Sequence, residues 1–83
     1  MIVRIHPHAA RRLAERGATE AEVRATIEGG EHFQAKFGRS GFRRNFPDVR
    51  VWQGRPYSTR QLEVYAVEED EGWLVITVLV KYF

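Results

Sequence analysis

The first repeating pattern of hydrophobic and polar positions has the period of an α-helix and lies between residues 7 and 17. With 100° per residue, the alanines and Leu13 of this stretch fall on one side of the helix, while His8, the arginines and Glu15 fall on the other. Pro7 suits the first helical position, and Gly17 suits the left-handed residue that ends a helix. We therefore expect a helix that packs through its alanine-rich side and exposes a charged side.

A second helix is predicted directly after the first, across a tight link. Thr19 and Glu22 have the spacing of a capping box, in which each side chain accepts a hydrogen bond from the backbone N–H of the other residue. Two glycines at positions 29 and 30 end this helix. Its buried side is expected to hold Val23, Thr26 and Ile27.

After residue 30 the hydrophobic period changes from helical to two, which is the period of a β-strand. Residues 1–5 also alternate and predict a short first strand. Glycine, proline and acidic clusters mark turns or loops at residues 38–41, 47–48, 54–58 and 69–72. The predicted strands are residues 1–5, 32–37, 42–46, 49–52, 61–68 and 73–82.

The last predicted strand is apolar on both sides, which is typical of a strand in the middle of a sheet. We expect the helices to cover its Leu74, Ile76, Val78 and Val80 side, with Val75, Thr77, Leu79 and Lys81 on the other side. The order β-α-α-β-β-β-β-β predicts a single α+β domain over residues 1–83. Its two N-terminal helices are expected to pack on one face of an antiparallel sheet and to leave the second face open.

The charge of the chain is unevenly distributed, although the net charge is only +2. Residues 32–60 carry seven basic side chains and one acid, whereas residues 61–72 carry five acids and no base. Eleven of the thirteen basic residues are arginine, whose planar group favours phosphate or carboxylate partners. A nucleic-acid partner is therefore plausible, but the acidic segment could instead neutralise the basic one within the fold.

Composition narrows the class of protein further. The absence of cysteine excludes disulfides and thiolate metal sites and fits a cytoplasmic location. The longest apolar run, residues 74–80, is too short to span a membrane, and early arginines argue against a signal peptide. His6 and His8 are separated only by Pro7 and have no further ligand nearby, so we expect neither a metal site nor a cofactor.

The open face of the sheet is where chemistry is expected. Cleavage of RNA needs a base for the 2′-hydroxyl, cations that stabilise the charged phosphorane, and an acid for the leaving oxygen. A surface that only binds RNA or protein carries the same kinds of residue. Alternation places Lys36, Arg43, Thr77 and Lys81 on this face, with Arg39 and Arg60 at turns beside it, and the groups for proton transfer are Tyr57, Tyr65, Tyr82, His8 and His32.

Arg44 lies between Phe42 and Phe46 on the apolar side of its strand. An unpaired buried guanidinium is costly, so Arg44 is expected to reach the rim of the sheet or to pair with Glu31 or Glu63. A structural ion pair is the usual fate of such a charge.

Two segments carry a resemblance to a known family: HPHAARRLAERGATEAEV (residues 6–23), and LEVYAVEEDEGWLVITVLVKYF (residues 62–83). They resemble a bacterial family of domains of unknown function related to BrnT and, more distantly, to the RelE/ParE toxin superfamily. The resemblance covers nearly the whole chain and rests on His8, Arg12, the Glu-Arg-Gly at 15–17 and the closing hairpin. It implies a RelE-like fold.

The RelE-type toxins that this chain resembles are ribosome-dependent mRNA endonucleases, and the BrnT-like proteins pair with a DNA-binding antitoxin. By this likeness the chain is expected to be a cytoplasmic toxin that acts on RNA or the ribosome and has an antitoxin partner. The candidate catalytic residues are then His8, Arg43, Arg60, Lys81 and Tyr82, and the candidate RNA-binding residues are Arg12, Arg16, Lys36, Arg39, Arg44 and Tyr57.

Two other hypotheses stay open from the sequence. One is a domain of the same fold that binds protein or nucleic acid without catalysis, and the other is a structural member of the family. Tyrosine and arginine side chains around an open groove favour a toxin or a binding domain. Arginines paired with Glu31, Glu63 and Glu68 favour the structural one.

Overall fold

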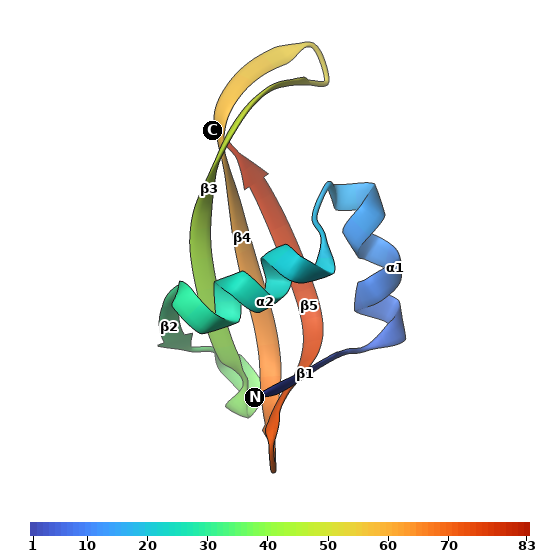
Figure 1. The fold of residues 1–83 in the computed structure, drawn as a ribbon, viewed down its shortest axis with the longest axis vertical. Helices are drawn as coiled ribbons and strands as arrows, with labels where there is room; N and C mark the ends of the chain where they lie inside the picture. The colour runs from blue at the N-terminus through green and yellow to red at the C-terminus, as the bar shows by residue number, and fades with distance from the viewer.

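The computed structural model describes residues 1–83, apart from the side chain of Trp52. A five-stranded sheet in the order β1-β5-β4-β3-β2 is covered on one face by two helices (Figure 1). The elements in chain order are β1 (Ile2–Ile5), α1 (Pro7–Arg16), α2 (Glu20–Gly29), β2 (Glu31–Gln34), the 3₁₀ turn Lys36–Gly38, β3 (Ser40–Trp52), β4 (Arg55–Glu69) and β5 (Gly72–Tyr82). The α+β class and the two N-terminal helices packed on the sheet are thus confirmed.

The helices form as their local signals predict. The capping box at Thr19 and Glu22 is present, and Gly17 ends α1 with a φ of 77°. The start of α1 has an additional cap, since the His6 side chain accepts a hydrogen bond from the His8 N–H at 3.1 Å. Neither helix is long and apolar enough to cross a membrane, as judged over the described residues.

The sheet is mixed, whereas the sequence predicts an antiparallel one. β1 pairs with β5 in parallel, with Ile2 opposite Gly72 and Ile5 opposite Val75, while the other strand pairs are antiparallel. The middle strand is β4 and not the apolar β5, because β1 adds on the outer side of β5. The core therefore centres on β4, whose Leu62, Val64 and Ala66 are fully buried.

A bulge in β5 changes which of its residues face the helices. Tyr65 pairs with Thr77 but Ala66 pairs with Val75, so Ile76 is an extra residue in the ladder. The predicted side is correct for Val78 and Val80 and wrong for Leu74 and Ile76. Before the bulge the alternation is reversed, and it is Val75 that lies in the core with Trp73 packed against it.

The segments predicted as strands 42–46 and 49–52 are one strand, β3, with a register irregularity between Pro47 and Arg50. Pro47 is tolerated because β2 pairs only with the first residues of β3, which leaves Pro47 at an edge. The predicted loop at 54–58 is also wrong, because β4 begins at Arg55. The turn is shorter, since Gln53 and Gly54 both adopt positive φ and reverse the chain in two residues.

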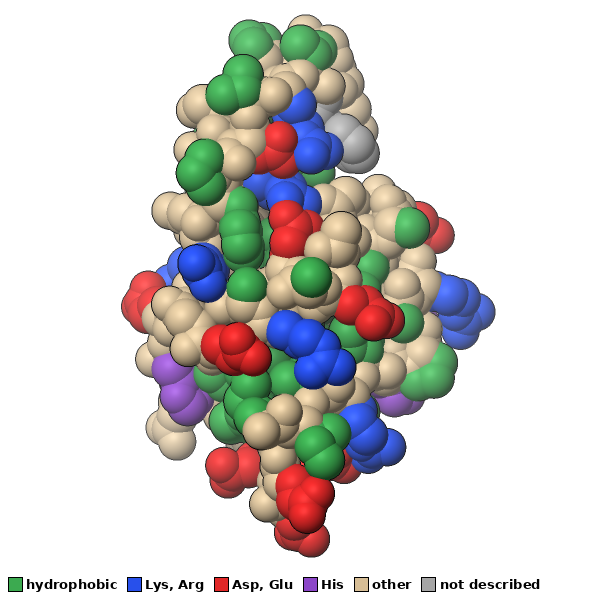
Figure 2. Space-filling model, viewed as in Figure 1, with side chains coloured by type: hydrophobic (Ala, Val, Ile, Leu, Met, Phe, Trp, Pro, Cys, Tyr) green, Lys and Arg blue, Asp and Glu red, His purple; other side chains and the backbone are tan. Residues whose placement is uncertain are grey.

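The ends of β3 and β4 project beyond the helices as a two-stranded arm, residues 49–57 (Figure 1). Hydrophobic side chains lie on its surface (Figure 2), and Val49 and Val51 are exposed there. At the opposite end of the molecule, the acidic residues 68–71 lie at the end of β4 and in the turn that leads to β5, where Arg4 pairs with Glu69 at 2.7 Å. Most of the acidic segment therefore lies around this turn and not against the basic strand β3.

Candidate functional site

A cluster of four polar side chains lies on the sheet face that the helices leave uncovered. We call Arg43 of β3, Glu63 and Tyr65 of β4 and Lys81 of β5 the open-face cluster. Glu63 is its centre: Oε2 accepts from Arg43 Nε at 2.9 Å and from Lys81 Nζ at 3.4 Å, and Oε1 accepts from the Tyr65 hydroxyl at 3.3 Å. Alternation puts these residues on the face opposite Leu62 and Val64.

Glu63 is only 4% exposed although no helix covers it, because its three partners surround it. Burial by itself raises the pKa of Glu63, but the hydrogen bond from Arg43 and the charge of Lys81 outweigh burial and lower the pKa below its ordinary 4.5. Burial and the nearby Glu63 charge raise the pKa of Tyr65 above 10.0. At neutral pH the cluster therefore holds a carboxylate acceptor beside a protonated phenol.

Arg43 also contacts β2. Its guanidinium lies 4.7 Å from the centre of the Phe33 ring and 3.7 Å from Glu31 Oε2. The Phe33 ring stands edge-on to Tyr65, with 6.1 Å between ring centres. Gly41 makes this arrangement possible, because a Cβ at that position would overlap the Phe33 ring.

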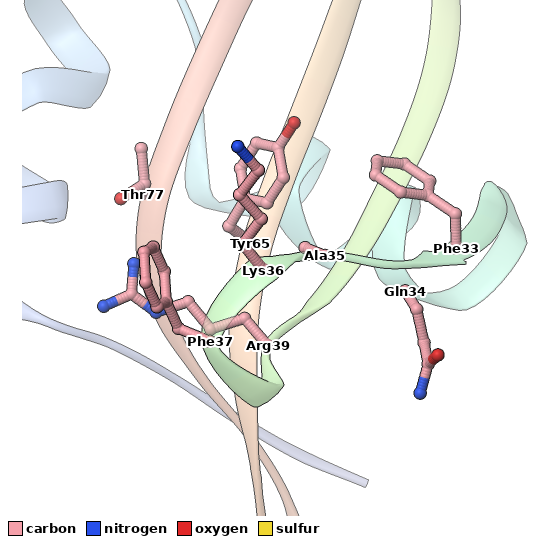
Figure 3. Close-up of a pocket in the computed structure, with 8 residues that line it drawn as sticks. All are labelled: Phe33, Gln34, Ala35, Lys36, Phe37, Arg39, Tyr65 and Thr77. Carbon is pink, nitrogen blue, oxygen red and sulfur yellow. The ribbon is translucent and has the colours of Figure 1, made fainter.

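A groove of about 440 Å³ adjoins the cluster at Tyr65 (Figure 3). In the close-up, Phe33 lies at one end, Thr77 at the other and Tyr65 between them, while the segment that carries Lys36 and Phe37 passes in front. The groove joins aromatic surface to two cationic side chains. Its lining residues are Phe33, Gln34, Ala35, Lys36, Phe37, Arg39, Tyr65 and Thr77.

Arg60 lies on the other face of the sheet, so its predicted position at a turn beside the open face is wrong. It belongs to β4 and is 7% exposed. Its guanidinium donates to the carbonyl of Gly17 and to both carboxylate oxygens of Glu22, one of them at 2.9 Å, and its Nε lies 3.1 Å from Asp48 Oδ2. Arg60 therefore joins the link between the helices, the start of α2 and β3.

Tyr82 and Tyr57 also lie away from the open-face cluster. The Tyr82 hydroxyl donates to the carbonyl of Arg16 at 3.0 Å, at the end of α1. The ring of Tyr57 lies 5.7 Å from that of Tyr82, and Arg50 lies over the Tyr82 ring at 5.9 Å. This aromatic pair connects the arm, through Tyr57, to the end of α1, through Tyr82.

Arg44 shares the helix-covered face with Phe42 and Phe46, as its spacing predicts. Of the two expectations for Arg44, exposure at the rim of the sheet is correct, and pairing with Glu31 or Glu63 is wrong because both acids pair with Arg43. Arg44 instead donates to the carbonyl of Ala25 in α2 at 2.9 Å and lies 5.3 Å from the centre of the Phe46 ring.

The exposed row of α1 lies beside β5. His8, Arg12 and Arg16 line a small cleft of about 70 Å³ together with Thr77, which also lines the groove. Arg16 donates to the carbonyl of Val78 at 2.5 Å. Among the residues that the structure describes, no three His, Asp or Glu side chains gather where they could hold a metal ion.

The structure thus brings Arg43 and Lys81 together and places Lys36 and Arg39 around the adjoining groove. The central residue, Glu63, is absent from the candidates that the sequence suggests. Its signal is present, however, since it stands between Leu62 and Val64 in an alternating strand and so must face away from the core.

Two carboxylates held by arginines, Glu22 and Glu63, predict a loss of stability in acid. Burial raises the pKa of Glu22, but hydrogen bonds from Arg60 and Thr19 outweigh it, so the pKa of Glu22, like that of Glu63, is lowered in the folded state. A lowered folded-state pKa contributes stability above the unfolded value of 4.5 that is lost as the pH falls through the folded value. Urea unfolding should therefore give a free energy that decreases below about pH 4.5, and Glu22→Gln should flatten this decrease. A free energy that is constant or increases toward about pH 3 would contradict this.

These features define a small α+β domain with a carboxylate held between cations on the uncovered face of a mixed sheet. The chain belongs to the family described as "Domain of unknown function (DUF4258)", whose model matches residues 5–80. The matched region contains the groove and all of the open-face cluster except Lys81. Comparisons with curated proteins and with solved structures gave no match.

Proposed function

We propose that this domain is a toxin-like endoribonuclease that cuts single-stranded RNA at the open-face cluster. The observation that carries the proposal is the nearly buried Glu63 carboxylate between Arg43, Lys81 and the Tyr65 hydroxyl, on the one sheet face that no helix covers. The resemblance to the RelE/ParE toxins is consistent with such an activity. An antitoxin protein and a ribosomal substrate belong to the same proposal.

The cations of the cluster suit a phosphodiester. Arg43 and Lys81 approach Glu63 from two neighbouring strands, so a phosphate seated over the carboxylate meets both of them. Charge-assisted hydrogen bonds to phosphate are short and strong, and they stabilise the phosphorane most when its charge is greatest. A bound phosphate also draws the two cations away from Glu63 and so makes its carboxylate a better base.

Glu63 and Tyr65 supply the proton transfers. The RNA 2′-hydroxyl attacks phosphorus and gives its proton to the Glu63 carboxylate, and the bond between phosphorus and the 5′-oxygen breaks. The leaving 5′-oxygen takes the proton of the Tyr65 hydroxyl. The products are a 2′,3′-cyclic phosphate and a 5′-hydroxyl, and the proton returns from Glu63 to Tyr65 through water.

In this proposal Glu63 and Tyr65 carry out the proton transfers, in place of the sequence candidates Tyr82 and His8. Tyr82 is hydrogen-bonded at the end of α1, on the helix-covered side. Arg60 is likewise held by Glu22 on that side and is proposed as a structural residue. His8 and Arg12 border the groove at Thr77, where they are proposed to contact RNA without taking part in cleavage.

A second candidate function is RNA or protein binding without catalysis. It is favoured by the pairing of Arg43 with both Glu63 and Glu31, which uses part of its charge within the fold. Lys81, Lys36 and Arg39 retain a cationic surface in either case. Only the cleavage function requires the carboxylate of Glu63.

Growth of a bacterial host tests the proposal. Induced expression of the wild-type domain should arrest growth and fragment cellular mRNA, and Arg43→Ala or Lys81→Ala should abolish both effects. Arg55→Ala is the matched control, because Arg55 is an exposed arginine of the arm. Normal growth with intact mRNA at high expression of wild-type protein would refute the toxin function, and fragmentation by the Arg43→Ala, Lys81→Ala double variant would refute this site.

A further inference from the structure

Phe37 adopts an unusual backbone conformation in an unusual place for an aromatic side chain. It has a φ of 62° within the 3₁₀ turn Lys36–Gly38, in the left-handed region that bulky residues rarely adopt. Phe37 and Gly38, which has a φ of 70°, are the two central residues of a tight turn in which the Arg39 N–H donates to the carbonyl of Lys36 at 3.3 Å. Glycine or asparagine suits such a position, and Phe37 is 87% exposed, so neither the turn nor packing explains why a phenylalanine stands there.

Phe37 lines the groove beside the open-face cluster. Phe37, Phe33 and Tyr65 supply aromatic surface to the groove, and Lys36 and Arg39 supply positive charge within two residues of Phe37 (Figure 3). The groove volume of about 440 Å³ lies within the ~300–1,000 Å³ typical of sites for small ligands. Aromatic side chains combined with a cationic groove are the features by which proteins bind single-stranded nucleic acid.

We propose that this groove is a nucleobase slot, in which an unpaired base of single-stranded RNA stacks against Phe37 while Lys36 and Arg39 contact the flanking phosphates. The inference rests on the proposed function, since Tyr65 belongs both to the slot and to the open-face cluster. The slot holds the nucleotide beside the phosphodiester that Glu63 acts on. Duplex RNA does not fit this mode, because its base faces are stacked on one another.

The charge of the surroundings favours RNA over a peptide as the occupant. Lys36 and Arg39 line the groove, and Arg43 and Lys81 stand beyond Tyr65, while Glu63 is covered by its partners. The groove therefore presents cations around an aromatic surface, which complements a base with a phosphate on either side. Recognition through the ring face tolerates any base, so we expect weak sequence preference.

Binding of a short oligonucleotide that cannot be cleaved tests the slot separately from catalysis. The probe is a labelled single-stranded oligonucleotide with 2′-deoxy sugars, measured by fluorescence anisotropy at low salt. Phe37→Gly should weaken binding by roughly 5- to 100-fold, the range for loss of one stacked base. Val49→Ala, an exposed apolar residue of the arm, is the control and should bind as the wild type does.

Thermal stability distinguishes a role of Phe37 in binding from a role in the fold. Glycine adopts positive φ freely, so Phe37→Gly should have a Tm equal to or above that of the wild type while it loses affinity. Phe37→Trp should keep the affinity, and its fluorescence should be quenched when a base stacks on it. A lower Tm for Phe37→Gly would mean that the ring serves the fold and would overturn the slot.

The remaining outcomes distinguish a failure of the nucleobase slot from a failure of the proposed nuclease activity. Equal binding by wild type and Phe37→Gly overturns the slot and leaves cleavage at Glu63 to be judged by its own assay. Weaker binding by Phe37→Gly in a protein that does not cut RNA supports the slot and refutes the nuclease. No binding of the oligonucleotide by the wild type, or binding only of a peptide, overturns the slot.

Discussion

Glu63→Gln is expected to slow RNA cleavage by about 10²–10⁴-fold, which is the usual contribution of a general base. Glutamine keeps the shape of the side chain and can still hydrogen-bond to the Tyr65 hydroxyl, but its amide cannot take the proton of the 2′-hydroxyl. The fold should survive, because the side chains of Arg43 and Lys81 are 36% and 53% exposed and remain hydrated without their acid partner. Single-turnover cleavage of a labelled RNA, with Tm measured in parallel, gives both quantities.

The control for this variant is Glu31→Gln. Glu31 is an exposed acid that lies 3.7 Å from Arg43. Glu31→Gln therefore removes the same charge at the edge of the site and leaves Glu63, at its centre, unchanged. Its cleavage rate should stay within a few-fold of the wild-type rate. A Glu63→Gln protein that cuts as fast as Glu31→Gln would show that Glu63 does not act as the base.

Arg60→Met is expected to destabilise the fold by about 3–5 kcal/mol, as removal of one partner from a buried ion pair does. Methionine fills much of the space but leaves the carboxylate of Glu22 without its cation, whereas Asp48 keeps its ion pair with Arg50 at 2.6 Å. For a domain of this size, such a loss lowers Tm by at least roughly 12 °C. Urea unfolding followed by circular dichroism measures the free energy directly.

A matched exposed change and a partial rescue make the Arg60 prediction specific. Arg55→Met in the arm should change the unfolding free energy by less than about 0.5 kcal/mol. Adding Glu22→Gln to Arg60→Met should recover part of the loss, because the carboxylate charge that has lost its cation is removed. An Arg60→Met protein that is as stable as the wild type but cannot bind RNA would contradict the structural role and return Arg60 to the functional site.

The helices could be predicted from the sequence because their signals are local. Gly17 and the capping box of Thr19 and Glu22 act within a few residues of one another, and both are present in the fold. The sheet was predicted less well, because its register depends on residues far apart in the chain. The extra residue at Ile76 exists only relative to Tyr65 on β4, and no pattern within β5 itself reveals it.

The residues of the candidate site could likewise be predicted where the signal is local, but not where it depends on contacts between distant parts of the chain. Lys81 and Arg43 were found by alternation within their own strands, and this was sufficient because both strands are regular at those positions. Arg60 was misplaced because Gly54 and Pro56 suggested a loop, whereas the two-residue turn lets β4 start at Arg55. That Arg60 reaches Glu22 depends on how α2 packs on the sheet, which the sequence does not state.

The central claim is that the open face cuts RNA by attack of the RNA's own 2′-hydroxyl on the adjacent phosphate. The products formed by the purified domain test this claim most directly. Two single-stranded oligonucleotides of the same sequence would be compared, one all RNA and one with a single 2′-deoxy sugar at the cleaved position. We expect a 2′,3′-cyclic phosphate and a 5′-hydroxyl from the first and no cut at that position in the second. Equal cutting of both, or no cutting of the RNA even with ribosomes present, would contradict the claim.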